Sequence, residues 1–516
     1  MGYLRKARLA VSIGFFLLVG ALFLDFGNRI PEWLSTGIVS LQLIPSFLNL
    51  FVSLGAAILG LLVIVGLTAA FGRVYCSSVC PLGTLQDIMI FFSNKIRGKR
   101  RFRYSKPPDA VHYTVLGVTV LLLLAGSLAA VNILDPFSNF GRIVTNLVRP
   151  AVVSVNNLAS AVLSDAGMYV LYQLSMVRLE PGVILFSVFF LGLVVFLCYR
   201  HGRLFCNLLC PVGALLKLIS KLSLYRLAIN PNTCKECGLC EKVCKANCIN
   251  ADEMTIDFGS CVSCFNCIDA CPTVGVVYQG IGGGRRGDRN REFDPDRRKV
   301  MNLFAGAVCV LGSSSVDSAR IDTASATRGR SRLPVTPPGS FGVDRFSDLC
   351  TACHLCVSAC PTQVIAPALL EYGLHGIFQP RLNYSDAYCK YECNECGKVC
   401  PTGAIVLLDI EVRKLVQVGK ATFIKDDCIV ITKKTDCGAC SEHCPTKAVY
   451  MVPYENLRLP ELNNDLCVGC GACERPCPTK PRKAIYVEAN PIHLQAKRPD
   501  TRKIEELPGS VQGFPF

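Results

Sequence analysis

The chain has little charge and little histidine for its length. Only 18% of its 516 residues are charged and 51% are hydrophobic, which departs from the composition of soluble multidomain proteins. Its six histidines include His112 and His201 at the ends of apolar segments, and no stacked pair inside a membrane is available, so b-type haem is excluded. No acid–base or nucleophilic constellation stands out. Redox or transfer chemistry must therefore reside in bound cofactors.

A nucleic-acid-binding motif is also absent, although the formal net charge is +15. The basic residues gather beside apolar segments, most densely between residues 95 and 106. Such loops stay on the cytoplasmic side of a membrane, where they face anionic lipid headgroups. We therefore expect no nucleic-acid partner.

Four apolar segments have about the 20 residues that a bilayer core requires. They are Leu9 to Phe26, Phe51 to Phe71, Val111 to Leu134 and Gly182 to Tyr199. The basic loops assign the N-terminus and residues 95–106 to the cytoplasm, and residues 27–50 and 135–181 to the outside. The sequence thus predicts a multi-pass protein of the inner membrane with a cytoplasmic N-terminus.

Cysteine, by contrast, is abundant: the chain has 31, and most of them fall into six runs. The runs are Cys234, Cys237, Cys240 and Cys244; Cys261, Cys264, Cys267 and Cys271; Cys350, Cys353, Cys356 and Cys360; Cys389, Cys393, Cys396 and Cys400; Cys428, Cys437, Cys440 and Cys444; and Cys467, Cys470, Cys473 and Cys477. In ferredoxins with such runs, three cysteines bind one 4Fe-4S cluster and the fourth binds the neighbouring cluster. The sequence therefore predicts six 4Fe-4S clusters.

Three other interpretations of these cysteines compete with iron–sulfur clusters. Zinc sites use two separated pairs rather than four cysteines in one run, and disulfides do not require this regular spacing. Residues 350–354 spell the c-type haem motif Cys-x-x-Cys-His, but both cysteines already belong to a run.

Swapped ligation makes the first two runs a compact two-cluster domain after the fourth span. One cluster then takes Cys234, Cys237, Cys240 and Cys271, and the other takes Cys261, Cys264, Cys267 and Cys244. The first run departs from the pattern, because Lys245 stands where the other runs have proline and Cys248 follows. Cys248 is either an alternative ligand or a spare buried thiol.

The last four runs have regular outer members and irregular inner members, which predicts nested pairing of first with fourth and second with third. The expected ligand sets are Cys350, Cys353, Cys356 and Cys477; Cys467, Cys470, Cys473 and Cys360; Cys389, Cys393, Cys396 and Cys444; and Cys428, Cys437, Cys440 and Cys400.

A glycine- and arginine-rich stretch between the two cluster regions ends in Arg297 and Arg298. With the apolar residues 300–312 it resembles a twin-arginine export signal; a soluble helix is the alternative. Because that route carries folded cargo, the residues behind the signal would be periplasmic. We expect a membrane domain at 1–222, a cytoplasmic two-cluster domain at 223–281, a linker with a short apolar segment at 282–316, and an exported four-cluster domain at 317–516.

Two further cysteine pairs, Cys76 with Cys80 and Cys206 with Cys210, follow the second and fourth spans. Each pair is preceded by a Gly-Arg dipeptide and followed by proline. Spacing of four places both thiols of a pair on one helix face, so two such helices offer four ligands to a shared metal centre, a candidate seventh iron–sulfur centre at the membrane. A disulfide within each pair is the alternative, but a Cβ separation of about 5–6 Å exceeds the usual disulfide span.

These motifs resemble a known family. Two Gly-Arg-x-x-Cys-x-x-x-Cys-Pro motifs on four spans, followed by a two-cluster ferredoxin, are similar to the NapH-type membrane ferredoxins of periplasmic nitrate reductase systems. Related accessory proteins of nitrous-oxide reductase and methylamine dehydrogenase look similar. Residues 297–516 resemble the exported NapG-type ferredoxins, so the chain looks like a fusion of the two.

The resemblance implies a quinol dehydrogenase-like oxidoreductase component of anaerobic respiration. Electrons from the membrane quinone pool would pass through 4Fe-4S clusters to a periplasmic redox partner or a multi-subunit respiratory complex. Two other functions stay open, namely an electron donor for maturation of an exported metalloenzyme and a ferredoxin-linked carrier. The outer loop at residues 135–182 offers a roof for a quinone site near Arg142, with a surface amphipathic hairpin as the alternative, and the quinone-binding residues are not assigned. We expect an all-α transmembrane domain of four spans, with a candidate short fifth, joined to two α+β ferredoxin-like domains.

Overall fold

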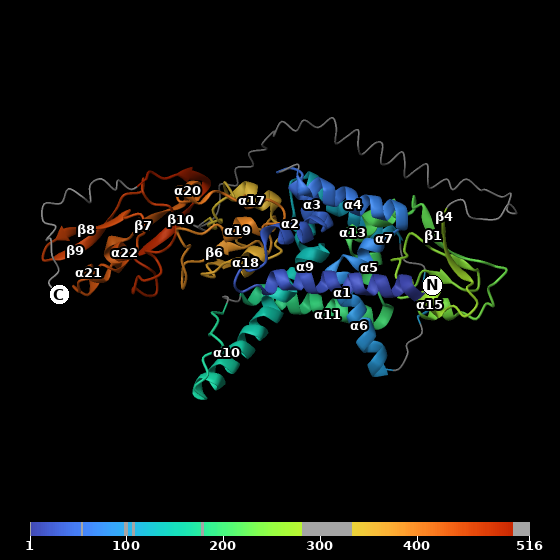
Figure 1. Cartoon of the computed structure of the whole chain (residues 1–516). Helices are drawn as coiled ribbons and strands as arrows, with labels where there is room; N and C mark the ends of the chain where they lie inside the picture. The colour runs from blue at the N-terminus through green and yellow to red at the C-terminus, as the bar shows by residue number, and fades with distance from the viewer. Residues whose placement is uncertain are drawn as a thin grey trace.

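The computed structural model describes residues 2–52, 55–97, 102–105, 109–176, 180–280 and 333–498. A helical region lies in the middle, with one cysteine-rich region at each end (Figure 1). The first two runs are at the end where the chain begins, and the last four runs are at the other. The twin arginine Arg297 and Arg298 and the apolar residues 300–312 lie outside the described residues.

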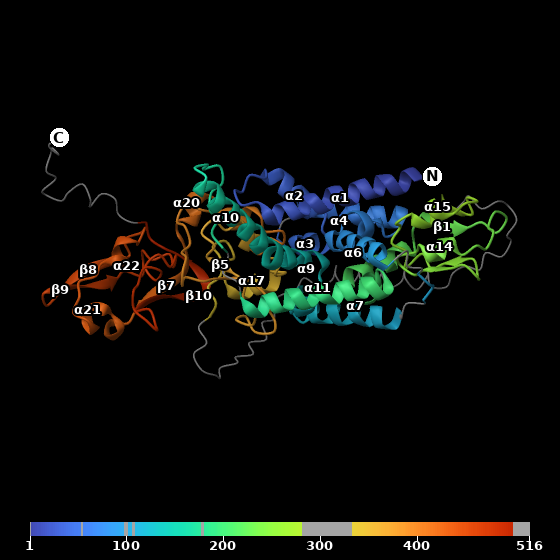
Figure 2. The same ribbon diagram turned by 90° about the horizontal axis from the view of Figure 1, so that it is seen from below.

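The helical region runs from the N-terminus to Ser220. Its helices are α1 (Gly2–Leu24), α2 (Glu32–Ser40), α3 (Leu43–Asn49), α4 (Ala56–Phe71), α5 (Val74–Ser78), α6 (Pro81–Arg97), α7 (Asp109–Leu124), α8 (Ala129–Leu134), α9 (Pro136–Ile143), the π-helical η1 (Val144–Val148), α10 (Arg149–Asp165), α11 (Pro181–His201), α12 (Leu204–Leu208) and α13 (Pro211–Ser220). Helices α1, α4, α7 and α11 follow the long axis of the molecule (Figure 2).

Three of the described helices are long and apolar enough to cross a membrane: Tyr3–Leu24, Pro136–Asp165 and Pro181–His201. Tyr3–Leu24 covers all but the last two residues of the first expected span, and Pro181–His201 contains the fourth. The second expected span is largely α4, and the third divides into α7 and α8. Helices α4 and α7 have 16 residues each, which at about 1.5 Å per residue makes them shorter than a bilayer core of about 30 Å. The number of spans therefore stays a prediction.

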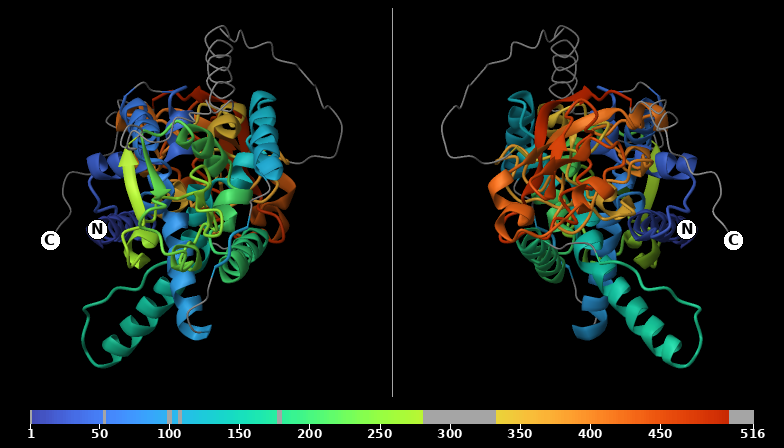
Figure 3. Two further views of the ribbon diagram at one scale, coloured as in Figure 1. Left: turned by 90° about the vertical axis from the view of Figure 1, so that its right-hand side faces the viewer. Right: turned by 90° about the vertical axis from the view of Figure 1, so that its left-hand side faces the viewer.

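Residues 136–165 differ from the expectation of an outer loop, because they form one continuous helix through α9, η1 and α10. The α9 segment is buried, whereas α10 projects sideways from the body (Figure 3). The segment after α10 returns along it, and Asn156 and Ser160 donate side-chain hydrogen bonds to the carbonyls of Tyr172 and Leu171, each at 2.8 Å. No charged residue stands between Arg149 and Asp165, so hydropathy allows a helix in lipid where the basic-residue count indicated a loop.

The two-cluster region contains β1 (Tyr225–Ile229), α14 (Leu239–Lys242), β2 (Ile249–Asn250), β3 (Thr255–Ile256), α15 (Asn266–Ala270) and β4 (Val276–Gly280). Strands β1 and β4 pair antiparallel, as do β2 and β3. The region docks on the ends of α4 and α11 through Gly72 and Gly202, which have φ angles of 79° and 68°. A side chain at Gly72 would meet the ring of Phe258, and one at Gly202 would meet the carbonyl of Lys245, so both contacts require glycine.

The four-run region contains α17 (Val343–Leu349), α18 (Leu355–Ala359), β5 (Ile365–Ala366), β6 (Arg381–Leu382), α19 (Glu395–Lys398), α20 (Ile410–Arg413), β7 (Val416–Phe423), the 3-10 turn η2 (Lys425–Asp427), α21 (Ile429–Thr432), α22 (Ala439–Glu442), β8 (Val449–Tyr454), β9 (Leu457–Leu462) and β10 (Ile485–Gln495). Its antiparallel pairs are β5 with β6, β7 with β10, and β8 with β9. The long β7–β10 ladder joins the two halves of the region.

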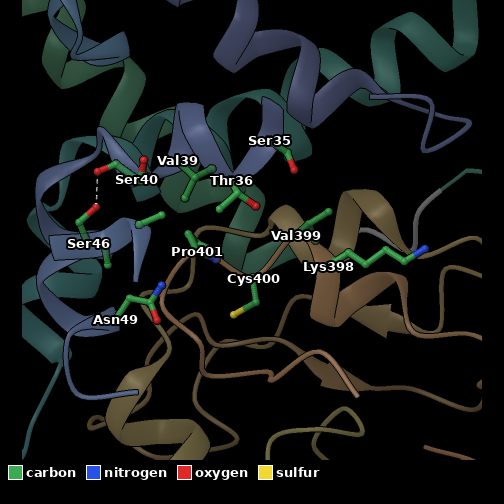
Figure 4. Close-up of a pocket in the computed structure, with 12 residues that line it drawn as sticks. Ser35, Thr36, Val39, Ser40, Ser46, Asn49, Lys398, Val399, Cys400 and Pro401 are labelled. Carbon is green, nitrogen blue, oxygen red and sulfur yellow. Dashed lines mark hydrogen bonds between the residues drawn. The ribbon is translucent and has the colours of Figure 1, made fainter. Parts of the chain in front are cut away.

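The four-run region contacts the helical region through α2 and α18. A small cavity of about 170 Å³ separates Thr36 and Val39 of α2 from Val399 and Pro401, and the sulfur of Cys400 points away from α2 (Figure 4). Next to it, Val19, Phe23 and Phe140 pack in one buried cluster with Cys353 and Leu355. The two regions thus share an apolar interface.

Candidate metal centres

The first two runs meet beside the ends of α4 and α11. Cys240 lies within electrostatic range of Cys234 and Cys237. Gly275 links Cys271 to this group: its N–H donates to Cys271 Sγ at 3.1 Å, and a Cβ placed on it would lie 3.2 Å from Cys234 Cα. This arrangement suits the first expected ligand set.

The second set gathers around the first run's last cysteine. Both Cys264 and Cys267 lie within electrostatic range of Cys244 and Cys261. Cys244 therefore lies among cysteines of the second run, as swapped ligation requires. Ligation itself stays a prediction.

Lys245 and Cys248, the two irregularities of the first run, both make specific contacts. The carbonyl of Lys245 accepts a hydrogen bond from Arg203 N at 2.8 Å, and its Nζ lies 3.0 Å from Asp87 Oδ1. The sulfur of Cys248 lies 3.5 Å from that of Cys244, and this thiol hydrogen bond lowers the pKa of Cys244 to about 7. Cys248 is therefore a hydrogen-bonding neighbour of an expected ligand.

In the five runs that end in Cys-Pro, the next residue is a threonine that faces the last sulfur of the run, a feature that the sequence analysis missed. The threonines are Thr273, Thr362, Thr402, Thr446 and Thr479. The Oγ1–Sγ distances range from 3.0 Å at Thr479 to 3.9 Å at Thr402. Hydrogen bonds to cluster sulfurs tune reduction potentials. The repeated Cys-Pro-Thr was the available signal, and in the first run Cys248 takes the role of the threonine.

The four later runs pair as neighbours in the structure, which corrects the nested pairing. The groups that lie together are Cys350, Cys353, Cys356 and Cys400; Cys389, Cys393, Cys396 and Cys360; Cys428, Cys437, Cys440 and Cys477; and Cys467, Cys470, Cys473 and Cys444. The fourth cysteine of every run thus joins a different group from the expected one. Closing a short loop between adjacent runs costs less chain entropy than closing one around two other runs. The wide spacing between Cys428 and Cys437 holds α21 and carries no pairing information.

These four groups lie in a row that starts at the helical region. Arg142 of α9 lies within electrostatic range of Cys350 and Cys353, in the first group. The second and fourth runs touch where Cys389 N donates to the carbonyl of Cys470 at 2.9 Å. The guanidinium of Arg413 donates to Cys389 Sγ at 2.8 Å, which places a cation on an expected ligand.

The c-type haem interpretation finds no support in the placement of His354. Its ring is buried, with Nε2 2.9 Å from the carbonyl of Phe378 and Nδ1 3.4 Å from Asn146 Nδ2. Burial lowers the pKa of His354 to about 3. The imidazole therefore serves the interface between α9–α10 and the four-run region.

The four membrane cysteines come together where α5 and α12 follow the long helices α4 and α11, next to the two-cluster region. Cys76, Cys80, Cys206 and Cys210 are each at most 5% exposed, and none forms a disulfide. Cys80 lies within electrostatic range of Cys76 and Cys206, and Cys210 lies within range of the other three. Within the described residues, no three His, Cys, Asp or Glu side chains converge on a single-ion site. A four-iron cube spreads its thiolates over a larger body than one ion does.

The two repeats exchange arginines across this site. Arg73 of the first repeat donates to the carbonyl of Cys206 at 3.0 Å, and Arg203 of the second donates to the carbonyl of Cys76 at 2.8 Å. The glycines after each Cys-Pro fit equally closely, because a Cβ on Gly83 would lie 2.1 Å from one of these carbonyls and a Cβ on Gly213 2.2 Å from the other. The repeats therefore form one pseudo-symmetric unit.

An apolar groove lies between α1 and α9–η1, near the four-run end. Its volume is about 590 Å³, and it is lined by Phe16, Leu17, Gly20, Ala21, Leu24, Asp25, Ile30, Leu85, Phe140, Ile143, Val144 and Val148. Phe140 belongs both to this lining and to the buried cluster around Cys353. Arg142 does not line this groove, because its guanidinium lies over the rings of Phe186 and Phe378, whereas the next two residues, Ile143 and Val144, do line it. A quinone site near Arg142 stays a prediction.

Comparison with protein families gives two matches. A model described as a 4Fe-4S binding domain matches residues 54–100 and 183–229, which contain the two membrane cysteine pairs. A model described as a 4Fe-4S dicluster domain matches residues 349–404 and 434–480. Each dicluster match covers cysteines of two neighbouring runs, in line with the adjacent pairing in the structure.

Several curated proteins are similar to parts of the chain. YccM of Escherichia coli, named as a candidate electron transport protein, is 26% identical over 43% of the chain and 55% of its own length. The ferredoxin-type protein NapH of Haemophilus influenzae is 25% identical over 42% of the chain and 65% of its own length, and NapG of Escherichia coli is 32% identical over 20% and 45%. The chain thus spans about half to two thirds of these relatives. No solved structure matches.

Proposed function

Because the chain is a relative of the NapH/NapG-type ferredoxins, and so an iron–sulfur electron-transport protein, we propose that it oxidises quinol in the membrane. The electrons pass through 4Fe-4S clusters held by the four-run region to a periplasmic redox partner. The six cysteine groups described above would hold six clusters, and each bound cluster supplies one-electron redox chemistry.

The apolar groove between α1 and η1 is the observation that carries this proposal. Its size and apolar lining suit the ring and first tail units of a quinol. Phe140 connects the groove to Cys353, so electrons enter the four-run region at its membrane end. A quinol bound here need not send its electrons across the hydrocarbon core to reach the exported side.

Asp25 is the one ionisable side chain among the described residues that line the groove. Oxidation of one quinol to quinone releases two electrons and two protons. The carboxylate of Asp25 accepts a proton from a quinol hydroxyl, while its backbone hydrogen bonds from Gly27 and Ile30, at 3.1 and 2.9 Å, fix its position. The second proton leaves through the solvent at this end of the helical region.

The test uses the whole chain, purified without oxygen and reconstituted in lipid. Adding a reduced quinol should bleach the cluster absorbance. Gly20→Phe should abolish this bleaching by filling the groove, because nothing lies within 4 Å of a Cβ at that position, while dithionite still reduces the clusters. Gly192→Phe is the matched control on α11, where a Cβ also meets open space. Equal bleaching by the two variants would reject the groove as the quinol site.

A ferredoxin-linked carrier is the second candidate, and one observation favours it. Cys237 of the two-cluster region is exposed, so a soluble redox partner can approach it. If quinol leaves the clusters oxidised but a reduced cytoplasmic-type ferredoxin bleaches them, this second function replaces the first. A periplasmic reporter fused after Phe516 tests the proposed location of the four-run region.

A further inference from the structure

The exchanged arginines of the two repeats differ in their charge partners. Arg203 Nε and Nη2 lie 3.0 and 2.8 Å from the carboxylate of Asp87, so Arg203 has a carboxylate partner, which it shares with Arg8 and Lys245. Arg73 makes no ion pair with any described carboxylate. It donates instead to Asn207 Oδ1 at 2.6 Å and to the carbonyls of Cys206 and Gly259 at 3.0 and 3.3 Å.

Arg73 is also fully buried, at 0% exposure, and its Nε has no hydrogen-bond partner. A guanidinium remains charged in proteins, and an isolated buried charge is costly unless an opposite charge lies nearby. The cysteine group lies close by, with Cys76 Sγ 4.0 Å from Arg73 Nη2. Neutral thiols or disulfides at this site would leave the charge of Arg73 unbalanced.

Four thiolates without a metal would carry four negative charges, which exceed the single positive charge of Arg73, and they would repel one another. Two positive charges, as in an oxidised 4Fe-4S cluster or Zn²⁺, leave four thiolates with a net charge of about −2. Such an anion beside Arg73 satisfies the arginine and relieves the repulsion. A metal group bound by the four cysteines would therefore supply the negative charge that no described carboxylate supplies to Arg73.

We propose that Cys76, Cys80, Cys206 and Cys210 hold one shared 4Fe-4S cluster, with Arg73 as the positioning residue that balances its charge. Iron–sulfur is favoured over zinc by the surroundings. Asn207 bridges Arg73 to the carbonyl of Ser260, at 3.1 Å, and Ser260 directly precedes Cys261 of the second run. The site therefore adjoins an expected cluster. This inference holds whichever donor reduces the protein.

Iron counting tests whether the centre is shared. In the full chain reconstituted in lipid, Cys76→Ala and Cys206→Ala should each remove roughly four irons, and the double variant should remove no more than either alone. Removal of roughly eight irons by the double variant would show two separate centres. Zinc in place of the missing iron, or unchanged iron in both single variants, would overturn the proposal.

Potentiometry with electron paramagnetic resonance tests the role of Arg73. Arg73→Gln should shift one cluster signal to a more negative midpoint potential, because a nearby positive charge favours the reduced cluster. Arg73→Lys should largely restore the potential, which a purely structural role would not predict. Arg149→Gln is the control, since Arg149 is a buried arginine that donates to the carbonyl of Phe23, away from these cysteines. Unchanged potentials in Arg73→Gln, with all clusters present, would refute the electrostatic role.

Discussion

Gly141 of α9 lies directly against the carbonyl of Cys353: a Cβ added to this glycine would be 2.4 Å from that oxygen. The contact joins the helical region to the first cysteine group of the four-run region. The same added Cβ would lie 2.6 Å from the ring of Phe23. Only a residue without a side chain permits this approach.

Gly141→Ala should loosen the interface, because a backbone oxygen cannot move aside as a flexible side chain can. We expect quinol-driven bleaching to slow markedly while the iron content stays unchanged. Stopped-flow absorbance measures the rate. Gly117→Ala on α7, where a Cβ meets nothing within 4 Å, should behave as the unmodified protein. An unchanged bleaching rate in Gly141→Ala would show that the contact between Gly141 and Cys353 does not contribute to electron entry into the four-run region.

The adjacent pairing of the later runs predicts how iron is lost from double variants. Cys350 and Cys400 lie in one group, so replacing both with alanine should remove roughly four irons. Cys350 and Cys477 lie in different groups, so that double variant should lose roughly eight. Nested pairing predicts the reverse for both proteins, and iron analysis distinguishes them.

Cys248→Ala should lower the potential of the cluster bound by Cys244, because it removes a hydrogen bond from the ligand sulfur. Cys248→Ser retains a donor and should move the potential less. Iron content should be unchanged in both. A loss of iron from Cys248→Ala would show instead that Cys248 is itself a ligand.

Asp87→Asn should destabilise the docking of the two-cluster region. The buried carboxylate of Asp87 contacts Arg8, Arg203 and Lys245 at 2.9, 2.8 and 3.0 Å. Although burial alone raises the pKa of Asp87, these cations hold it well below its usual value. Removing the charge of Asp87 leaves these three cations without their carboxylate partner, which should lower the free energy of unfolding by about 3–5 kcal/mol.

Thermal unfolding in detergent measures this effect of Asp87. Because the pKa is depressed in the folded state, the advantage of the unmodified protein is fully present above pH about 4 and shrinks as pH falls below it. Lys245→Ala removes only one of the three cations and serves as the milder control. A pH-independent difference between Asp87→Asn and the unmodified protein would contradict the ionic explanation.

The sequence predicts the cysteine groups better than their pairing. The spacing of the cysteines in the six runs is enough to predict iron–sulfur binding. The order of the first two runs is enough to predict that Cys244 lies among the cysteines of the second run. The four later runs have equivalent terminal cysteines, so only the fold decides which group Cys400 or Cys477 joins. The course of residues 136–165 agrees with their hydropathy but not with the count of basic residues that assigned them to an outer loop, and the packing of α9 against α6 and α11 buries their first part.

The repeated Gly-Arg dipeptides are visible in the sequence, but their exchange is not. That Arg73 reaches Cys206 depends on how the two repeats face each other in space. The unequal partners of Arg73 and Arg203 arise from single positions, since Asp87 in the first repeat corresponds to Lys217 in the second. Lys217 instead pairs with Asp109, at 2.6 Å.

The exchanged arginines also bear on the internal symmetry of the chain. Neither repeat contributes more than two of the four central thiols, and each depends on the other's arginine to bind its first cysteine carbonyl. One repeat alone would therefore be incomplete. Two identical copies related by a twofold axis would supply every one of these contacts, so one chain here has the internal arrangement of a symmetric dimer, and Asp87 and Lys217 are equivalent positions at which its two halves differ.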